Sequence, residues 1–406
     1  MIKQDLEYTV MKNTLFKKIG EYLPQLIAIR RDIHQHPETA FEERRTSALV
    51  AKTLEGWGIA VTRGIAGTGL VGTIRGRRPG IRSIGLRADM DALNIEEATG
   101  LAYSSGYPGK MHACGHDGHT AMLLGAARYL AGDPDFAGTV HLIFQPAEEE
   151  GGGGRKMIEE GLFERFPCDA VYGLHNEPGL PAGRFGIRPG PMLANVDTWA
   201  VRFAGTGGHG AVPHRAVDPS LPLAHFLLGL QTIIGRNVPA RETAVISTGY
   251  IAAGHVRSTN VIPSEIVVRG TARSYEPSVR NILERRLSEL AVNLAAAHEC
   301  TAVVSYERGY PALINATEQT QLAAAAAVRT VGEERVEALY PAITAGEDFA
   351  YMLEERPGAF MLIGNGVEAD GTFHHVHTPR FDFNDDILSF GIGYWINIVK
   401  LELVTE

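Results

Sequence analysis

Nine residues, Met111–His119, constrain this chain more than any other segment, because they contain three histidines, one cysteine and one aspartate. Few packed cores need that composition. Cys114 and His116 offer a thiolate and an imidazole, which suit zinc, cobalt, nickel or manganese. Gly115 and Gly118 let the backbone turn so that neighbouring side chains converge. The segment therefore predicts half of a metal site.

A blander interpretation is open for each of these residues taken alone. Isolated histidines are common, and a cysteine beside a helix is usually a small buried hydrophobic residue. A metal ion needs at least about four donors, and one short loop cannot supply all of them with good geometry. The metal interpretation therefore depends on ligands elsewhere in the chain.

Two further segments place polar side chains at the ends of expected strands. The apolar run Thr139–Phe144 leads into Pro146 and the carboxylates of Glu148 and Glu149, at the strand end where open α/β sheets bind ligands. Adjacent carboxylates are usually a solvated charge run, but the proline and the buried strand favour a cleft. Val171–His175 likewise delivers a histidine to a strand end.

A last donor-rich segment, residues 373–385, has three histidines in four positions before an aromatic and acidic turn. One of His374, His375 and His377 is expected to be a ligand. The separate segments together supply enough donors for a metal centre.

The chain as a whole resembles the M20 group of metallopeptidases and amidohydrolases. The resemblance is to the branch of hippurate hydrolases, N-acyl-amino-acid amidohydrolases and plant auxin-conjugate hydrolases. It runs from Arg30–Glu38 through Leu86–Leu93 to Phe381–Asp386. It implies a two-domain fold, in which a ferredoxin-like lid or dimerisation domain is inserted into a metallopeptidase-like α/β catalytic domain.

The resemblance also implies roles for individual residues. Two divalent metal ions per subunit, manganese or zinc with cobalt or nickel as alternatives, would be held by Cys114, His116, Glu149, His175 and His377. His175 would bind the second metal or complete the first. Glu148 would be the general base, and Asp91 and Asp117 would orient ligands without touching the metals. His374 and His375 match no ligand position.

The donor set suits hydrolysis. Two divalent ions about 3.5–4 Å apart polarise a carbonyl and lower the pKa of water towards about 7. Glu148 would take the proton of that water and then protonate the leaving amine. Asn94, Glu150 and Gly346 depart from the residues usual in the family, and none of these departures removes an expected ligand; Glu150 would add charge near the metals.

Composition agrees with a large enzyme of two domains. The chain has 406 residues, of which 45% are hydrophobic, and a formal net charge of -9, so it lacks the basic footprint of a nucleic-acid or anionic-membrane binder. Its three cysteines are odd in number and widely spaced, as in a reducing compartment. No apolar signal-peptide core begins the sequence, and no run of about 18 apolar residues could span a membrane. We therefore expect a cytoplasmic protein.

The donors predict the domain limits. Residues 187–307 contain almost none of them and predict a βαββαβ order, which is the ferredoxin-like pattern. The expected elements are strand Thr198–Phe203, helix Ser220–Ile234, strands Thr243–Thr248 and Glu265–Arg269, helix Ser278–His298 and strand Thr301–Ser305. The flanking segments 1–186 and 308–406, with helices such as Phe16–His34 and Thr120–Leu130, would form one α/β sheet flanked by helices.

Three residues of the inserted segment gain candidate roles from the resemblance. His209 would stabilise the oxyanion, often in the partner subunit's active site, and Asn260 and Arg273 would hold the substrate carboxylate or the transition state. The alternative is that His209 lies in a glycine-rich strand connection and that Asn260 and Arg273 are exposed strand residues. A shared site would require a homodimer or homotetramer.

The favoured function is metal-dependent hydrolysis of the amide bond of an N-acyl amino acid to a carboxylic acid and a free amino acid. A dipeptidase or carboxypeptidase with the same metals is the first alternative. Cys114 acting as a nucleophile beside a histidine is the second, and a non-enzymatic metal-binding or scaffolding role is the third. The sequence leaves the acyl group, the amino acid, the native metal and the pathway open.

Overall fold

The computed structural model describes residues 14–367 and 370–404. The expected absence of a signal peptide concerns residues 1–13, which lie outside this part of the chain. The chain divides into two compact units. The larger comprises Met1–Met192, Ile314–Pro341 and Asp348–Glu406, and the smaller comprises Leu193–Leu313 and Ala342–Glu347. The limits 187–307 for an inserted folding unit remain a prediction.

The larger unit is built on a mixed eight-stranded sheet with the order β1-β2-β4-β3-β5-β16-β6-β15. Its strands are β1 (Ala60–Ile65), β2 (Gly69–Arg75), β3 (Arg78–Asp89), β4 (Ala137–Gln145), β5 (Ala170–Pro178), β6 (Phe185–Gly186), β15 (Val336–Glu337) and β16 (Gly358–Gly366). The central strands β4, β3, β5 and β16 are parallel. Strands β4, β5 and β16 and the second half of β3 are almost wholly buried, because helices cover both faces. The α/β prediction is therefore confirmed.

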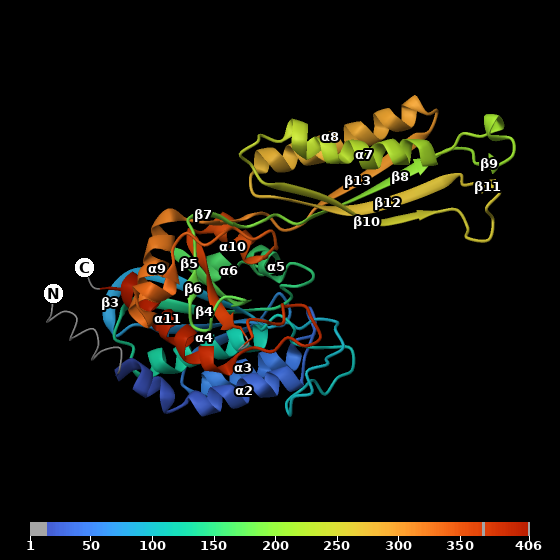
Figure 1. The fold of residues 1–406 in the computed structure, drawn as a ribbon. Coiled ribbons are helices and arrows are strands. Elements are labelled where there is room, and N and C mark those ends of the chain that lie inside the picture. The colour runs from blue at the N-terminus through green and yellow to red at the C-terminus, as the bar shows by residue number, and fades with distance from the viewer. Residues whose placement is uncertain (1–13, 368–369, 405–406) are drawn as a thin grey trace. The chain divides into compact units, whose positions relative to one another are not determined.

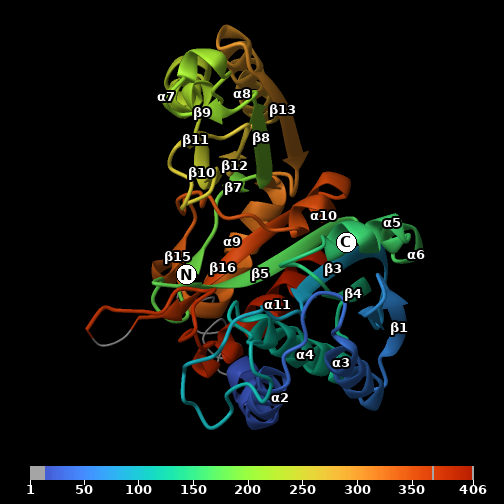
Figure 2. The ribbon, with the colours of Figure 1, turned by 90° about the vertical axis from the view of Figure 1, so that its right-hand side faces the viewer.

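Helices cover this sheet in two layers (Figure 2). One layer comprises α2 (Leu23–Gln35), α3 (Arg44–Gly56), α4 (His116–Gly132), α9 (Thr317–Val331) and α11 (Leu388–Glu402). The other comprises α5 (Gly153–Glu159), α6 (Leu162–Arg165) and α10 (Phe349–Glu355). The prediction of one continuous helix from Phe16 to His34 was wrong, because a turn at residues 21–22 separates helical residues 14–20 from α2.

The position of α4 under the sheet depends on glycines. Most of this helix is buried, as its apolar composition requires. A Cβ atom on Gly118 would lie 2.3 Å from the ring of Phe383, and one on Gly125 would lie 2.5 Å from Ile392. Only glycine therefore lets the C-terminal segment pack this closely, which fixes the start of α4 beside the strand ends.

The smaller unit is a four-stranded antiparallel sheet, β10-β12-β8-β13, with two helices packed on one face (Figure 1). Its elements are β8 (Asp197–Ala204), α7 (Ser220–Asn237), β10 (Ala244–Ala253), β12 (Glu265–Ser274), α8 (Pro277–Ala297) and β13 (Thr301–Arg308). A separate ribbon pairs β9 (Gly208–His209) with β11 (Val261–Ile262). The order βαββαβ along the chain and the order of the strands in the sheet confirm the ferredoxin-like prediction.

Two short strands, β7 (Gly190–Leu193) and β14 (Leu313–Asn315), pair where the chain leaves and re-enters the larger unit. Among residues 14–367 and 370–404, no helix combines the length and the hydropathy that crossing a bilayer demands.

Candidate metal centre

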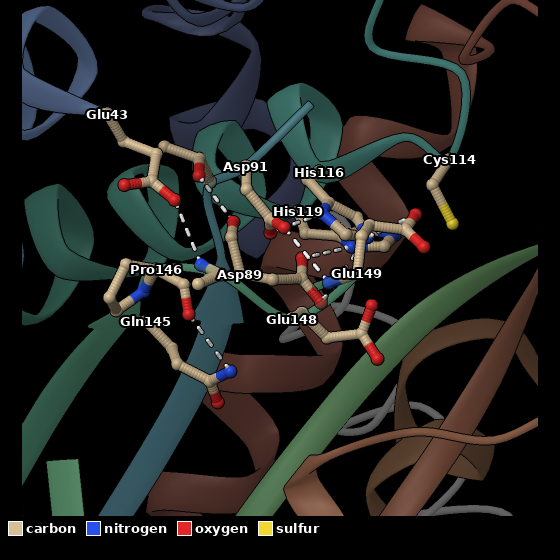
Figure 3. Close-up of polar contacts among 12 residues, drawn as sticks. Glu43, Asp89, Asp91, Cys114, His116, His119, Gln145, Pro146, Glu148 and Glu149 are labelled. Atoms are coloured by element: carbon tan, nitrogen blue, oxygen red, sulfur yellow. Dashed lines mark hydrogen bonds and ion pairs between the residues drawn. The ribbon is translucent and has the colours of Figure 1, made fainter. Parts of the chain in front are cut away.

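Donor side chains from five places in the chain meet at the carboxyl edge of the central strands of the larger unit. Figure 3 shows those of Cys114, His116 and Glu149. The loop before α4, the first turn of α4, the loop after β4, the end of β5 and the segment after β16 contribute Cys114, His116, Glu149, His175 and His377, respectively. All five predicted ligands are therefore in one cluster. This edge is where open α/β sheets bind ligands, because parallel strands end there together.

Cys114 and His175 approach each other directly. The Sγ atom of Cys114 lies 3.3 Å from Nε2 of His175. A zinc ion with a Zn–S distance of about 2.3 Å and a Zn–N distance of about 2.05 Å would hold such atoms about 3.6 Å apart. Nδ1 of His175 lies 2.7 Å from the carbonyl oxygen of Asn176, so this nitrogen donates and Nε2 carries the lone pair. The pair fits one metal ion.

His116 is oriented in the same way by a carboxylate. Its Nδ1 lies 3.1 Å from Oδ1 of Asp91, and both side chains are buried. Its Nε2 is buried without a hydrogen-bond partner and lies 3.8 Å from Oε1 of Glu149. A buried imidazole nitrogen left unpaired beside a carboxylate is costly unless a cation lies between them. The arrangement therefore fits a metal ligand.

Glu149 completes the connection between the two sides of the cluster. Its Oε1 lies 3.0 Å from Nε2 of His377, and its backbone N–H donates to Oδ2 of Asp91 at 2.9 Å. Donor atoms of Cys114, Glu149 and His377 all lie within 4.8 Å of one another, as do those of Cys114, His116 and His175. Cys114 belongs to both groups, which suits two neighbouring ions.

The cluster carries an excess of buried negative charge. Burial raises the pKa of the Cys114 thiol well above its ordinary value, and the nearby carboxylates, first that of Glu149, raise it further. Burial alone would lower the pKa of His116, but the carboxylates, first that of Asp89, raise it to about 10. Divalent cations would neutralise this charge and deprotonate the thiol.

Glu148, the predicted base, sits beside the ligands and is not one of the five. Its side chain is buried, with 6% exposed, and its Oε1 accepts the backbone N–H of Asp348 at 3.4 Å. Ala147 before it has a φ of 53°, a left-handed conformation that costs about 1–2 kcal/mol for an L-residue. This turn directs the next two side chains away from the strand.

Three residues without a predicted role, Asp89, His119 and Asn176, support the cluster through hydrogen bonds. The Nδ1 of His119 lies 2.7 Å from Oδ1 of Asp89, and its Nε2 accepts the backbone N–H of Asn176 at 3.0 Å. Because Asn176 in turn accepts from His175, these contacts fix the ring of a ligand. The signal for His119 was its position three residues after His116, on the same helix face.

Asp117 contacts different partners from those of Asp91. Its Oδ2 lies 2.8 Å from Nδ1 of His34 and 3.8 Å from the buried guanidinium of Arg30. Burial would lower the pKa of His34, but the hydrogen bonds to Asp117 and Glu97 raise it to about 9. Asp117 thus belongs to a buried ion-pair network with His34 and Arg30.

The remaining residues of interest in this region lie at the surface. His374 and His375 are exposed, and the structure places neither in the cluster. Asn94 and Glu150, two of the departures from the family pattern, are also exposed.

In the smaller unit, His209 and Asn260 are neighbours. Both are exposed, and Gly210 donates its N–H to the carbonyl oxygen of Asn260 at 2.8 Å. Nδ1 of His209 accepts the N–H of Ala211 at 3.0 Å, which leaves an N–H on Nε2. Arg273 lies elsewhere, on β12, where it donates to backbone carbonyl oxygens of its own unit.

The sequence pattern of Peptidase family M20/M25/M40 matches residues 85–401. The N-acetyl-L-cysteine deacetylase of Bacillus subtilis is 42% identical over 363 residues, which cover 89% of this chain and 84% of that one. The chain belongs to peptidase family M20. The matched region contains all five predicted ligands and Glu148.

Other M20 relatives differ in the kind of hydrolysis that their names specify. The hippurate hydrolase of Campylobacter jejuni is 36% identical over 370 residues, covering 91% of this chain and 94% of that one. Thermostable carboxypeptidase 1 of Saccharolobus solfataricus is 37% identical over 376 residues, covering 90% and 92%. As an M20 enzyme with these relatives, the chain is a hydrolase of amide bonds.

A solved M20 structure has the same fold. The YXEP protein of Bacillus subtilis, a dinuclear metal-binding peptidase, matches with a TM-score of 0.81 and 32% identity, covering 95% of this chain and 100% of that one.

Proposed function

We propose that this M20 hydrolase cleaves the amide bond of N-acyl amino acids and releases a carboxylic acid and a free amino acid. The observation that carries the proposal is the pair of adjacent glutamates after β4. Glu149 faces the imidazole of a second ligand, and Glu148 lies buried beside it. A storage or scaffolding site needs the first carboxylate but not the second.

Two divalent ions, manganese or zinc, would be held by Cys114, His116, Glu149, His175 and His377. When bound, they supply Lewis acidity at the amide carbonyl and a water molecule of lowered pKa. Glu148 accepts the proton of the attacking water and returns it to the amine nitrogen as the amide bond breaks. The N–H of Asp348, 3.4 Å from Oε1 of Glu148, holds the base in place during both transfers.

Relatives support N-acyl amino acids over peptides. The names of two close relatives specify an N-acetyl amino acid and hippurate, which are acylated on the amino group. Thermostable carboxypeptidase 1 keeps peptide hydrolysis as the second candidate. A free α-amino group on the substrate distinguishes the two.

The structure disfavours a cysteine nucleophile. Attack by Cys114 would need a thiolate at neutral pH, and a low pKa is what activates such residues. Burial and the carboxylate of Glu149 instead raise the pKa of this thiol. Cys114 suits a metal ligand better, since a cation removes that obstacle.

His209 is proposed to complete an active site as the donor that stabilises the oxyanion. Its N–H on Nε2 and its exposed position support this role. Asn260 beside it and Arg273 are proposed to bind the substrate carboxylate. We propose that a homodimer is the smallest active form.

The test is release of amino acid from N-benzoylglycine, N-acetylcysteine and matched dipeptides, by protein that has been chelated and then resupplied with manganese, zinc or cobalt. Release from the acylated substrates, restored by metal, is expected. Release only from substrates with a free amine would favour the peptidase. Release that chelation does not affect would contradict the metal-dependent mechanism.

A further inference from the structure

A buried carboxylate outside the proposed ligand set touches the loop that carries Glu148. Glu43 immediately precedes α3, its residue is 0% exposed, and its side chain makes no capping hydrogen bond to that helix. Its Oε2 accepts the hydroxyl of Thr68 at 2.6 Å. Its Oε1 accepts the backbone N–H of Ala147 at 2.9 Å and that of Phe41 at 3.1 Å. Among the described residues it forms no ion pair, so every donor to it is neutral.

Ala147 is where the loop begins. Its φ of 53° turns the chain out of β4, and its carbonyl oxygen accepts the N–H of Gly153 at 2.9 Å. This second bond closes residues 147–153 into a loop that contains Glu148 and Glu149. The bond from the N–H of Ala147 to Glu43 therefore ties the base of this closed loop to a separate part of the chain.

A second carboxylate, that of Asp91, accepts a hydrogen bond from the same loop two residues later. Oδ2 of Asp91 accepts the N–H of Glu149, while its Oδ1 contacts His116 (Figure 3). Alternate backbone amides of the loop thus donate to Glu43 and to Asp91. Asp91 couples the loop to a ligand, whereas Glu43 couples it to the region before α3.

We infer that Glu43 is a positioning residue for catalysis, which fixes the left-handed turn at Ala147 and thereby the positions of Glu148 and Glu149. It acts as a hydrogen-bond acceptor of the correct length, because none of its partners carries a charge that would require a negative partner. This inference rests on the proposed function in assigning Glu148 the role of base.

Three substitutions of Glu43 distinguish the effect of side-chain length from the effect of charge. Glu43→Gln keeps the length and one carbonyl acceptor, and its NH₂ group can donate to the hydroxyl oxygen of Thr68. Glu43→Asp keeps the charge but withdraws the acceptor by one methylene, and Glu43→Ala removes it. We expect kcat to stay within about threefold for Glu43→Gln. For the other two it should fall about 10–100-fold, as for other groups that orient a metal site, with KM changed less than about threefold.

The cobalt-loaded protein gives a readout that needs no substrate. Movement of Glu149 should shift the visible absorption bands of bound cobalt in Glu43→Asp and Glu43→Ala, and leave them unchanged in Glu43→Gln. Glu38 provides the matched control, because it accepts two backbone N–H groups, from Arg45 and Thr46, at 2.9 and 2.8 Å and has no hydrogen bond to the loop. Glu38→Gln and Glu38→Ala should keep the wild-type kcat and spectrum.

Several results would overturn the inference. One is a wild-type kcat and cobalt spectrum in Glu43→Asp, and another is a Glu43→Gln variant as impaired as Glu43→Asp. If Glu43→Ala does not fold, the glutamine and aspartate variants carry the test. If the wild-type protein hydrolyses no N-acyl amino acid, the proposed function fails, while the cobalt spectra still decide whether Glu43 positions the loop.

Discussion

The two units of this chain present their candidate residues in opposite ways. In the larger unit, His116 and Glu148 are buried, and each contacts a residue from a distant part of the sequence. In the smaller unit, which has its own apolar core, His209 lies on the short β9–β11 ribbon and Asn260 directly precedes β11, and both are exposed. Mutual contact and burial support His116 and Glu148, whereas His209 is supported by family resemblance, its exposed position and the N–H on its Nε2. The buried, mutually contacting residues of the larger unit and the exposed residues of the smaller unit can therefore be tested separately.

The largest expected effect lies in the larger unit. Glu148→Gln removes the proton acceptor but keeps the size of the side chain, so kcat should fall about 10²–10⁴-fold while metal content is unchanged. Steady-state kinetics with a metal-restored N-acyl substrate, together with metal analysis, measures both quantities.

Glu150→Gln is the control for Glu148→Gln, because Glu150 is an exposed glutamate of the same loop. It should keep the wild-type kcat. Equal rates in the two variants would remove Glu148 as the base.

The smaller unit should give the next largest effect. Loss of a hydrogen-bond donor to an oxyanion typically costs about 10²–10³-fold in kcat, and His209→Ala is expected to fall in this range with unchanged metal binding. His255→Ala is a matched control, because Nδ1 of His255 accepts the N–H of Arg257 at 3.2 Å in the same local arrangement.

A His209→Ala variant with wild-type kcat would mean that His209 does not stabilise the oxyanion. Mixing His209→Ala with Glu148→Gln extends the test. If His209 serves the partner subunit's site, hybrid dimers regain activity in one of their two sites. If each subunit uses its own His209, mixing restores nothing.

The sequence predicted which donor side chains would cluster better than it predicted the residues that hold them in place. Cys114, His175 and His377 could be predicted from the sequence because metal-binding side chains cluster in short motifs at strand ends. His119 was visible in its motif but received no role, since a helix spacing alone does not say which carboxylate the ring will meet. Glu43 gave no signal, because its function depends on an amide about one hundred residues away in the chain.

Helix and strand periodicity likewise predicted some parts of the fold and missed others. The βαββαβ order of the smaller unit follows from local patterns that alternate clearly. The turn at residues 21–22 was missed because the apolar spacing on either side of it continues as in one helix. Pairing of β16 beside β5 depends on contacts between distant segments, which local patterns do not specify.

The smallest expected effect is the pH dependence that Glu43 gives to the free energy of unfolding of the larger unit. Burial raises the pKa of Glu43 from 4.5 to about 7. The protonated form is therefore favoured by folding, so its contribution to stability is fully present below about pH 4.5 and is lost as the pH rises through about 7. This contribution is worth at most about 3 kcal/mol in the free energy of unfolding.

Urea unfolding of wild-type and Glu43→Gln proteins between pH 5 and pH 8 should resolve this term. Trp57 and Trp395 lie in the larger unit and Trp199 in the smaller, so a Trp199→Phe background restricts the fluorescence signal to the larger unit. The wild type should lose stability relative to Glu43→Gln as the pH rises, and proton release from metal ligands cancels in the difference. A difference that stays constant with pH would show that Glu43 remains ionised in the fold, in which case its charge is stabilised by its three neutral donors alone.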